Sequence, residues 1–415
     1  MSKRDDHAPE CTGGDGDTCI DRVIRSREKD LGGTIVRRTL PSAGRRRVGP
    51  FTFFDHFGPA TMSAEASRRG GMSVRPHPHI GLATITYLYE GAVFHRDSLG
   101  SAQRITPGAI NWMTAGRGIA HSERTPEDLR GAAFGMHGLQ IWIALPSADE
   151  ETEPAFHHHP AESLPEGEVG GVKLRQLVGE AYGLSSPVAT FSPMFYTDAA
   201  MPDGATLAAP EGYEERAFYV VQGAVDCEGA THEAGTMLVL RPGGAPSVTA
   251  RGAAQVIVLG GARLEGERLI WWNLVSSDRE RLEAAKLAWK EDRFPRVPGE
   301  GDERIPLPEE PPHIELIEHS AGGEFRVYKD GAALGEMTWR KVRGPTDGAV
   351  MDIVHTGVRD ALKGQGWARR LVNRGVREAR ERGWTILPHC SYARHVITTT
   401  DGLKDVLTPG WEERL

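Results

Sequence analysis

The chain has 415 residues, and at roughly 100 to 200 residues per domain this length predicts two to four domains. The 49 Lys and Arg against 57 Asp and Glu give a net charge of −8, which argues against a general nucleic-acid coat. The 50 Gly and 27 Pro argue against an all-helical protein, and the four scattered Cys argue against a disulfide scaffold and favour a reducing, cytoplasmic location.

The N-terminal residues 1–31 are polar, charged and without periodicity, so we expect a disordered tail. This opening lacks the apolar core of a signal peptide, and nowhere do apolar residues approach the ~18 in a row that a membrane helix needs. We therefore expect no membrane partner, and the acidic charge predicts no direct nucleic-acid partner.

Short apolar runs of strand length follow over residues 32–150, each bounded by Gly or Pro: ATITYLY (83–89), AINWM (109–113) and LQIWIAL (139–145). Residues 151–190 are rich in Glu, Pro, Gly and His, which predicts a connecting segment with one or two short strands. Strands resume over residues 191–298, with FYVVQG (218–223), TMLVL (236–240) and AQVIVLGG (254–261). This spacing predicts β-sandwiches or barrels.

The two β-rich segments resemble each other. ATITYLYEGAV aligns with RAFYVVQGAV so that Gly91 falls on Gly223, and a Pro-Gly turn follows each segment, at Pro107-Gly108 and at Pro242-Gly243. A repeat of this kind indicates two similar barrels in one chain.

A helix and a change of composition follow the second β-rich segment. Helical spacing predicts a helix packed on the barrels through Leu282, Ala285, Lys286 and Trp289. The acidic, Pro-rich residues 299–312 then predict a linker. We expect residues 313–415 to form a separate α/β domain.

Two dyads in the first β-rich segment carry residues that bind metals. His77 and His79 alternate along one predicted strand, and His121 and Glu123 along another, so each pair points to one side of its strand. Residues two apart on a strand lie about 6.6 Å apart. Two side chains can close this gap around one ion, with each ligating nitrogen about 2.1 Å from the ion. If the two strands face each other, three imidazoles and one carboxylate surround one ion, which keeps positions open for O₂, water or substrate.

The donor set suits a borderline divalent ion, and Fe(II), Mn, Ni, Cu and Zn all remain open, while the lack of thiolate argues against purely structural zinc. Alone, His77 and His79 would be interpreted as ordinary loop histidines. The second dyad in the same segment is what favours a metal site.

The segments around these residues resemble the pirin family. The pattern His77-x-His79 followed by Thr84 and Gly91 resembles the first cupin motif, except that Thr84 stands where cupins commonly place a Glu ligand. FFDHFGPA, RPHPHIGLATITYLYEGAVFHRDSLG, WMTAGRGIAHSE and WWNLVSSDRERLEAAKLAWKEDRFPRVPG resemble pirin segments, in which a Glu two residues after the third His, here Glu123, replaces that ligand. Over residues 32–308 the resemblance implies two cupin (double-stranded β-helix, jelly-roll) barrels and one metal, usually described as iron, held by His77, His79, His121 and Glu123.

The resemblance also implies an activity. Bacterial pirins are associated with quercetin 2,3-dioxygenase activity, so we expect an Fe(II)-dependent dioxygenase acting on quercetin or another flavonol or catechol, with Glu123 as the base that accepts a hydroxyl proton. Pirins are also implicated as metal- or redox-sensing regulators that bind a transcription factor or metabolic enzyme, and this non-enzymatic function is the alternative. In the second barrel Ala209 and Glu211 fall where His77 and His79 stand, so we expect one metal per chain.

The C-terminal domain contains a candidate anion site. A strand at 351–358 is followed by the Gly-rich turn KGQGWA (363–368) and by a helix that we expect to end near Arg382, with Gly383 beyond it. Glycines let backbone amides approach an anion and the helix N-terminus adds its dipole, although such a turn alone is more often structural.

This span resembles the small single-domain class of GCN5-related N-acetyltransferases (GNAT), in which a strand, a Gly-rich turn and a helix hold acetyl-CoA. The resemblance implies an acetyl-CoA site formed by Val358, Gly364, Gln365, Gly366, Trp367 and Ala368. Cys390 matches a Cys of that class and is a candidate nucleophile or general acid, with buried packing as its other interpretation. His355 is a second candidate base.

Overall fold

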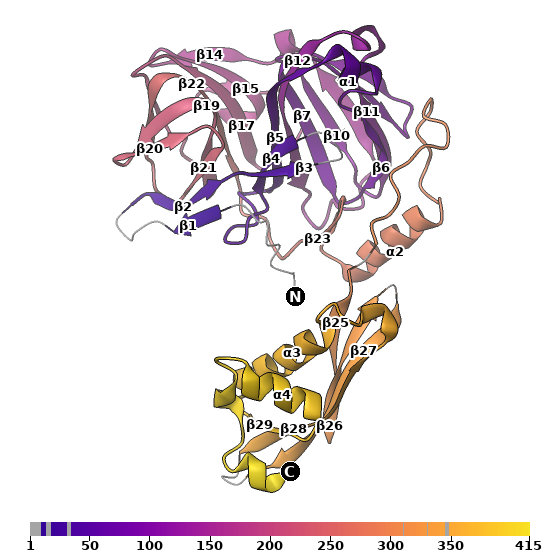
Figure 1. The fold of residues 1–415 in the computed structure, drawn as a ribbon. Coiled ribbons are helices and arrows are strands. Elements are labelled where there is room, and N and C mark those ends of the chain that lie inside the picture. Colours follow the sequence, from indigo (N-terminus) through magenta and orange to yellow (C-terminus); the bar gives the residue numbers. More distant parts are fainter. Residues whose placement is uncertain (1–9, 14–17, 31–34, 310, 330, 345–347) are drawn as a thin grey trace. The chain divides into compact units, whose positions relative to one another are not determined.

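The computed structural model of the protein describes residues 10–13, 18–30, 35–309, 311–329, 331–344 and 348–415. The chain divides into two units, Met1–Leu307 and Pro308–Leu415. The first unit is built of β-sheets that form two barrels, and the second is a small α/β unit (Figure 1). In the described ranges no helix is long and apolar enough to cross a membrane.

The first barrel consists of two antiparallel sheets. The larger is, in spatial order, β13 (Ala155–His159), β10 (Ile110–Thr114), β7 (Leu82–Glu90), β12 (Phe134–Ala144), β5 (Phe51–Met62), β4 (Ile35–Leu40) and β3 (Arg27–Asp30). The smaller is β6 (Val74–His79), β11 (Ile119–Arg124), β8 (Val93–Asp97) and β9 (Ala102–Ile105). The short helix α1 (Ala64–Arg68) lies between β5 and β6 in the chain. The sheets face each other, because Thr86 of β7 reaches Glu123 of β11 and Trp142 of β12 contacts His79 of β6.

The second barrel is formed by one large antiparallel sheet. Its main path is β1 (Glu10–Gly13), β2 (Ile20–Arg25), β21 (Thr236–Leu240), β19 (Glu215–Cys227), β22 (Ser247–Gly261), β17 (Met194–Met201), β15 (Val172–Ala181) and β14 (Glu166–Val169). Three short strands pair onto this path: β16 (Leu184–Ser185), β18 (Thr206–Ala208) and β20 (Ala230–Glu233). Apolar side chains such as Phe195 and Phe218 fill its own core.

A shared core joins the two barrels. It takes Tyr87 and Trp112 from the first barrel and Tyr196 and Tyr219 from the second, and all four are almost completely buried. The larger sheet of the first barrel is therefore buried on both faces. This explains why ATITYLY is a nearly continuous apolar run rather than an alternating one.

The two barrels repeat the same backbone detail, as the sequence predicts. Gly91 and Gly223 have φ values of 88° and 75°. A Cβ at Gly91 would lie 2.5 Å from the Gly135 carbonyl oxygen, and a Cβ at Gly223 would lie 2.4 Å from that of Ala253. Only glycine fits both positions, because each combines the left-handed region with a close carbonyl.

Two expected boundaries are wrong. Residues 20–30 of the expected disordered tail form β2 and β3; β2 pairs with β21 and buries Ile24 completely. The expected connecting segment 151–190 supplies β13 to the first barrel, and β14, the long strand β15 and β16 to the second. The strands of both segments lie at or next to the ends of their sheets and pair through backbone groups, so a polar composition does not reveal the pairing.

The helix α2 (Arg279–Lys290) follows the hairpin of β23 (Leu269–Trp271) and β24 (Leu274–Ser276). Asp278 caps its N-terminus by accepting a hydrogen bond from the Glu280 backbone amide at 2.8 Å. Its buried residues are those that the helical spacing predicts: Leu282, Ala285, Lys286 and Trp289.

The expected linker 299–312 is partly wrong as well, because the first unit extends to Leu307. The Ile305 backbone amide donates to the Pro76 carbonyl at 2.8 Å, and the Trp289 indole donates to the Ile305 carbonyl at 3.0 Å. We call residues 297–307 the strap. Two of its acidic residues, Glu300 and Glu303, pair with Arg124 of β11, so a linker-like composition here marks a packed segment.

The second unit is a five-stranded sheet with helices α3 (Trp367–Arg382) and α4 (Ser391–Thr399) packed against its core. The strand order is β25 (His313–His319), β26 (Gly322–Lys329), β27 (Ala332–Arg343), β28 (Ala349–Val358) and β29 (Thr385–Pro388), with only β28 and β29 parallel. Helix α3 is flanked by Gly366 and by the expected Gly383, both in the left-handed conformation.

Candidate metal centre and acetyl-CoA site

Three buried histidines meet inside the first barrel. His77 and His79 lie on β6, and His121 lies opposite His77 on the antiparallel neighbour β11. The ligating nitrogens of the three rings all lie within 4.8 Å of one another. The expectation that the two strands face each other is wrong: they pair side by side in one sheet, and backbones about 4.8 Å apart bring the dyads together.

Two backbone carbonyls orient the rings of the first dyad. His77 Nδ1 donates to the Arg75 carbonyl at 2.9 Å, and His79 Nδ1 donates to the Asn273 carbonyl at 2.9 Å. Because a carbonyl only accepts hydrogen bonds, both Nδ1 atoms carry the proton and both Nε2 atoms present a lone pair. Metal-binding histidines in proteins are oriented in this way.

The spacing of the nitrogens fits one divalent ion. His79 Nε2 and His121 Nε2 are 3.1 Å apart. Two nitrogens about 2.1 Å from one ion, at an angle of about 90–110°, would lie about 3.0–3.4 Å from each other. His79 and His121 can therefore share an ion as they stand, and the ligating nitrogen of His77 lies within 4.8 Å of both.

Burial keeps these imidazoles in the form that binds metals. It lowers the pKa of His77 to about 4, although the hydrogen bond to the Arg75 carbonyl acts in the opposite direction. Burial, together with the neighbouring histidines, also holds the pKa of His79 and of His121 well below the ordinary value. Neutral imidazole is the ligating species, so the site is prepared for a cation at neutral pH.

Glu123 lines the same cavity but is not part of the three-histidine cluster. A bulge separates it from His121 on β11, and its carboxylate accepts a hydrogen bond from the Thr86 hydroxyl at 3.0 Å. Burial raises the pKa of Glu123, while His95 and Thr86 act in the opposite direction. Thr84, which takes the usual place of a cupin Glu ligand, is buried on β7.

A cavity of about 560 Å³ opens beside the histidines. One wall is aromatic: Phe53 and Trp142 stack at 3.9 Å with an interplanar angle of 12°, and the rings of Trp142 and His79 meet edge to face at 5.2 Å. The Arg38 guanidinium lies 4.3 Å above the Phe53 ring and is held there by Asp55. A cavity with such an apolar wall suits an aromatic ligand.

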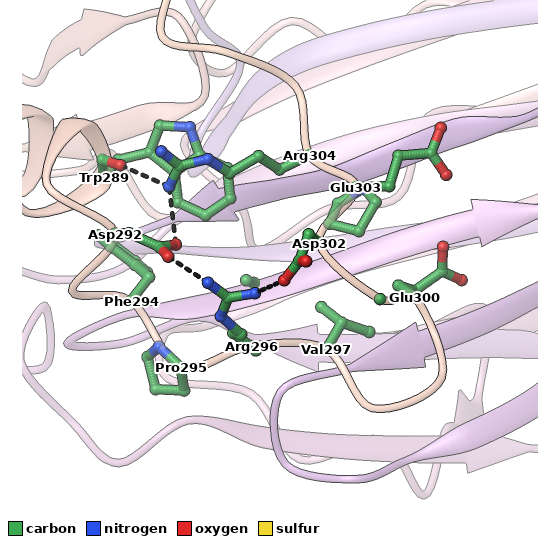
Figure 2. A pocket seen from close by; sticks show the side chains of 13 residues that line it. Trp289, Asp292, Phe294, Pro295, Arg296, Val297, Glu300, Asp302, Glu303 and Arg304 are labelled. Carbon is green, nitrogen blue, oxygen red and sulfur yellow. Dashed lines mark hydrogen bonds and ion pairs between the residues drawn. The ribbon is translucent and has the colours of Figure 1, made fainter.

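The strap lies against the strands that carry the histidines (Figure 2). Glu300 accepts from the Ser122 hydroxyl at 2.9 Å and from Arg124 Nε at 3.0 Å, so it holds both neighbours of Glu123. Within the strap region Arg296 bridges Asp292 and Asp302, and Arg304 donates to Asp292 and to the Trp289 carbonyl (Figure 2).

The second barrel lacks the corresponding ligands. Ala209 is buried and Glu211 is exposed at the positions that the repeat matches to His77 and His79. Across the described part of the chain, the three histidines of the first barrel are the sole cluster of potential metal ligands.

The Gly-rich turn of the second unit lies between β28, which ends at Val358, and α3. Gly364 and Gly366 have φ values of 74° and 76°, and no side chain caps the helix, which begins with Trp367 and Ala368. The Gln365 side chain donates to the Ala361 carbonyl at 2.9 Å. Left-handed glycines and a helix N-terminus within one turn are features that suit an anion site.

The two other candidates of this unit lie on adjacent strands. His355 is exposed on β28, and Cys390 follows β29, caps α4 and donates its backbone amide to the Ile353 carbonyl at 2.8 Å. Cys390 is half-buried and packs against the core. No hydrogen bond joins His355 to Cys390 within the ranges that the structure describes.

The sequence prediction does not include Asp97, Asn273 or Glu300, which lie close to the histidine cluster or its strands. Asp97 follows His95 with the same period of two that relates His77 and His79, so this alternation on β8 is a signal that could have revealed Asp97. Asn273 contributes only a backbone carbonyl, and Glu300 acts from a segment expected to be a linker. Neither has a sequence signal, because each acts through a contact that only the fold creates.

Comparisons with known proteins agree with this architecture. The family model described as Pirin matches residues 33–143, the Pirin C-terminal cupin domain matches 196–295, and the GCN5-related N-acetyl-transferase family matches 324–406. The chain is 47% identical over 292 residues to a Pirin-like protein of Caulobacter vibrioides, covering 70% of this chain and 100% of that relative. It is 35% identical over 189 residues to human Pirin, covering 45% of this chain and 60% of that protein.

Among solved structures, quercetin 2,3-dioxygenase from Acinetobacter baumannii superposes with a TM-score of 0.64 at 34% identity, covering 70% of this chain and 95% of that one. Fold and site thus define a mainly β protein of two cupin barrels, with a buried three-histidine cluster in the first and a GNAT-like domain at the C-terminus. The chain belongs to the pirin family.

Proposed function

We propose that the first barrel is a metal-dependent dioxygenase that acts on quercetin or another flavonol or catechol. The observation that carries the proposal is the buried histidine cluster opening onto a cavity with an aromatic wall. The likeness to a structure named quercetin 2,3-dioxygenase supports the substrate class. We further propose that Glu123 is the fourth ligand, that Fe(II) is the resident ion and that each chain holds one.

An ion held by His77, His79 and His121 would supply Lewis acidity and redox chemistry with O₂. The chain's own residues do the rest. Phe53 and Trp142 bind and orient the rings of the substrate, and the buried walls exclude water. Glu123, next to the histidines, accepts the proton of the substrate hydroxyl.

The test is metal analysis and O₂ consumption by the unmodified chain beside His77→Ala. We expect one Fe(II) per chain, loss of quercetin with matching O₂ uptake, and loss of both metal and activity in the variant. Full metal retention by His77→Ala would contradict the assignment of the ligands. Metal binding without turnover of any flavonol or catechol would instead favour the metal-sensing regulator, which binds a protein partner.

We also propose that the C-terminal domain binds acetyl-CoA and transfers its acetyl group to an amine. The family match over residues 324–406 and the two left-handed glycines at the start of α3 support this. Val358 and the turn residues Gly364 to Ala368 would hold the pyrophosphate and pantetheine through backbone groups. Cys390 and His355 stay candidates for the chemical step.

Calorimetry with acetyl-CoA tests the binding site. We expect Gly366→Ala to weaken binding at least tenfold, because the substitution strains the left-handed turn, while Gly402→Ala, at an equally left-handed position away from the turn, should leave binding unchanged. Equal affinities would contradict the site.

A further inference from the structure

The third histidine of the cluster is oriented differently from the other two. His77 and His79 each donate through Nδ1 to a backbone carbonyl, whereas His121 Nδ1 faces Nδ1 of another imidazole, His95, at 3.4 Å. His95 Nε2 in turn lies 3.1 Å from Asp97 Oδ2. His121, His95 and Asp97 thus form a row of contacts that runs from the histidine cluster along the sheet.

All three side chains of this row of contacts are buried. His121 is 1% exposed, His95 3% and Asp97 0%. His121 pairs with Asp97 across β11 and β8, and the His95 ring stacks on Phe156 of β13 at 4.3 Å with an interplanar angle of 14°. Because the three side chains are almost completely buried, they must satisfy one another's hydrogen-bonding groups, and this sets the direction of each hydrogen bond.

The direction follows from which atoms can only accept. If His121 binds an ion through Nε2, its proton is on Nδ1 and needs an acceptor. His95 Nδ1 can accept only when the His95 proton is on Nε2, and that proton then needs an acceptor of its own. Asp97 Oδ2 meets this need, since a carboxylate only accepts.

Asp97 is itself held in place. Its other oxygen, Oδ1, accepts from the backbone amides of Leu99 at 2.9 Å and Ser101 at 3.0 Å, in the turn between β8 and β9. The carboxylate therefore cannot rotate without breaking these hydrogen bonds.

We propose that Asp97 and His95 are positioning residues of the metal centre, which act through hydrogen bonds to hold His121 in the tautomer that presents Nε2 to the ion. The inference rests on the proposed metal site and assigns a function to two residues outside its ligand set. Removal of such a supporting partner typically weakens metal binding about 10- to 100-fold.

Asp97→Asn is the sharpest test because it keeps the shape of the side chain and reverses the direction of its hydrogen bond to His95. The amide oxygen must stay on the Leu99 and Ser101 amides, so the amide nitrogen faces His95 and donates to its Nε2. His95 then carries its proton on Nδ1, and two N–H groups oppose each other at the His121 contact. Asp128→Asn, at an exposed carboxylate that pairs with Arg104, is the matched control.

The measurement is titration of the full chain with Co(II), read from its visible absorption bands and from competition with a chelator. We expect Asp97→Asn to bind Co(II) 10- to 100-fold more weakly than the unmodified chain, with altered bands, and Asp128→Asn to bind as the unmodified chain does. Circular dichroism verifies folding. If Asp97→Asn does not fold, His95→Phe, which keeps the stacking on Phe156 but removes the acceptor, should show the same weakening.

Equal Co(II) affinity and equal spectra in the Asp97 and Asp128 variants would overturn the inference. Failure of the unmodified chain to bind Co(II) would overturn the proposed metal centre itself, and so the two failures are distinguishable.

Discussion

Replacing Glu300 tests whether the strap is part of the metal-binding barrel. The Glu300 side chain is 6% exposed and holds Arg124, which is 14% exposed, together with the Ser122 hydroxyl. Glu300→Gln removes the charge that pairs with Arg124 and leaves a neutral amide in its place. Because hydrogen bonds to charged groups contribute about 1.5–3 kcal/mol, we expect the free energy of unfolding of the first unit to fall by about 2 kcal/mol.

Glu303→Gln is the matched control. Glu303 pairs with the same Arg124, but its side chain is 50% exposed. An exposed ion pair contributes about 0–1 kcal/mol, so this variant should be close to the unmodified chain. The pair of variants separates the effect of burial from the effect of charge on the same arginine.

The assay is urea unfolding, with Co(II) affinity as a second measurement. Ser122 and Arg124 flank Glu123 and follow His121, so a loosened strap should also weaken Co(II) binding several-fold. If the Glu300 and Glu303 variants show the same stability and the same affinity, the strap contributes nothing to the barrel and the reasoning is refuted.

Three further predictions follow from buried groups and glycines. Burial first, and Arg37 second, lower the pKa of His137 to about 4, below the unfolded value of about 6.5, so its stabilising contribution is present above pH 6.5 and is lost as the pH falls toward 4. His137→Gln should therefore reduce the slope of the unfolding free energy against pH between pH 4 and 6.5 by about 1.4 kcal/mol per pH unit. His157→Gln, at an exposed histidine, is the control, and equal slopes in the two variants would contradict the prediction. Gly91→Ala and Gly223→Ala should each lower the free energy of unfolding by about 3 kcal/mol or more, because a carbonyl blocks the new Cβ. Gly100 is also left-handed but lies in open space, so Gly100→Ala should lower it by only about 1–2 kcal/mol in the same unfolding assay. Equal losses at all three positions would refute the steric argument. Asp352 is buried in the second unit and pairs with Arg340 and His389. Asp352→Ala should lower the free energy of unfolding by about 1–3 kcal/mol, whereas Asp401→Ala, at an exposed residue, should leave it unchanged; thermal unfolding measures both.

The sequence alone was enough to predict the parts of the protein that depend on local pattern. Alternation along a strand identifies His77 and His79 as a dyad, helical spacing identifies the buried face of α2, and the aligned Gly91 and Gly223 identify the repeated barrel. These predictions succeed because period and backbone conformation are properties of neighbouring residues.

The tertiary structure alone decided which distant segments meet. The polar strands β2 and β13 were interpreted as a tail and a connecting segment because strand pairing uses the backbone, which leaves no apolar pattern in the sequence. The strap was interpreted as a linker because its acidic, Pro-rich composition does not reveal that Glu300 is buried against Ser122 and Arg124. The contacts among Asp97, His95 and His121 likewise exist only because β8 and β11 are neighbours. A hydrogen bond between strands depends on their register, and register is a property of the whole sheet rather than of either strand.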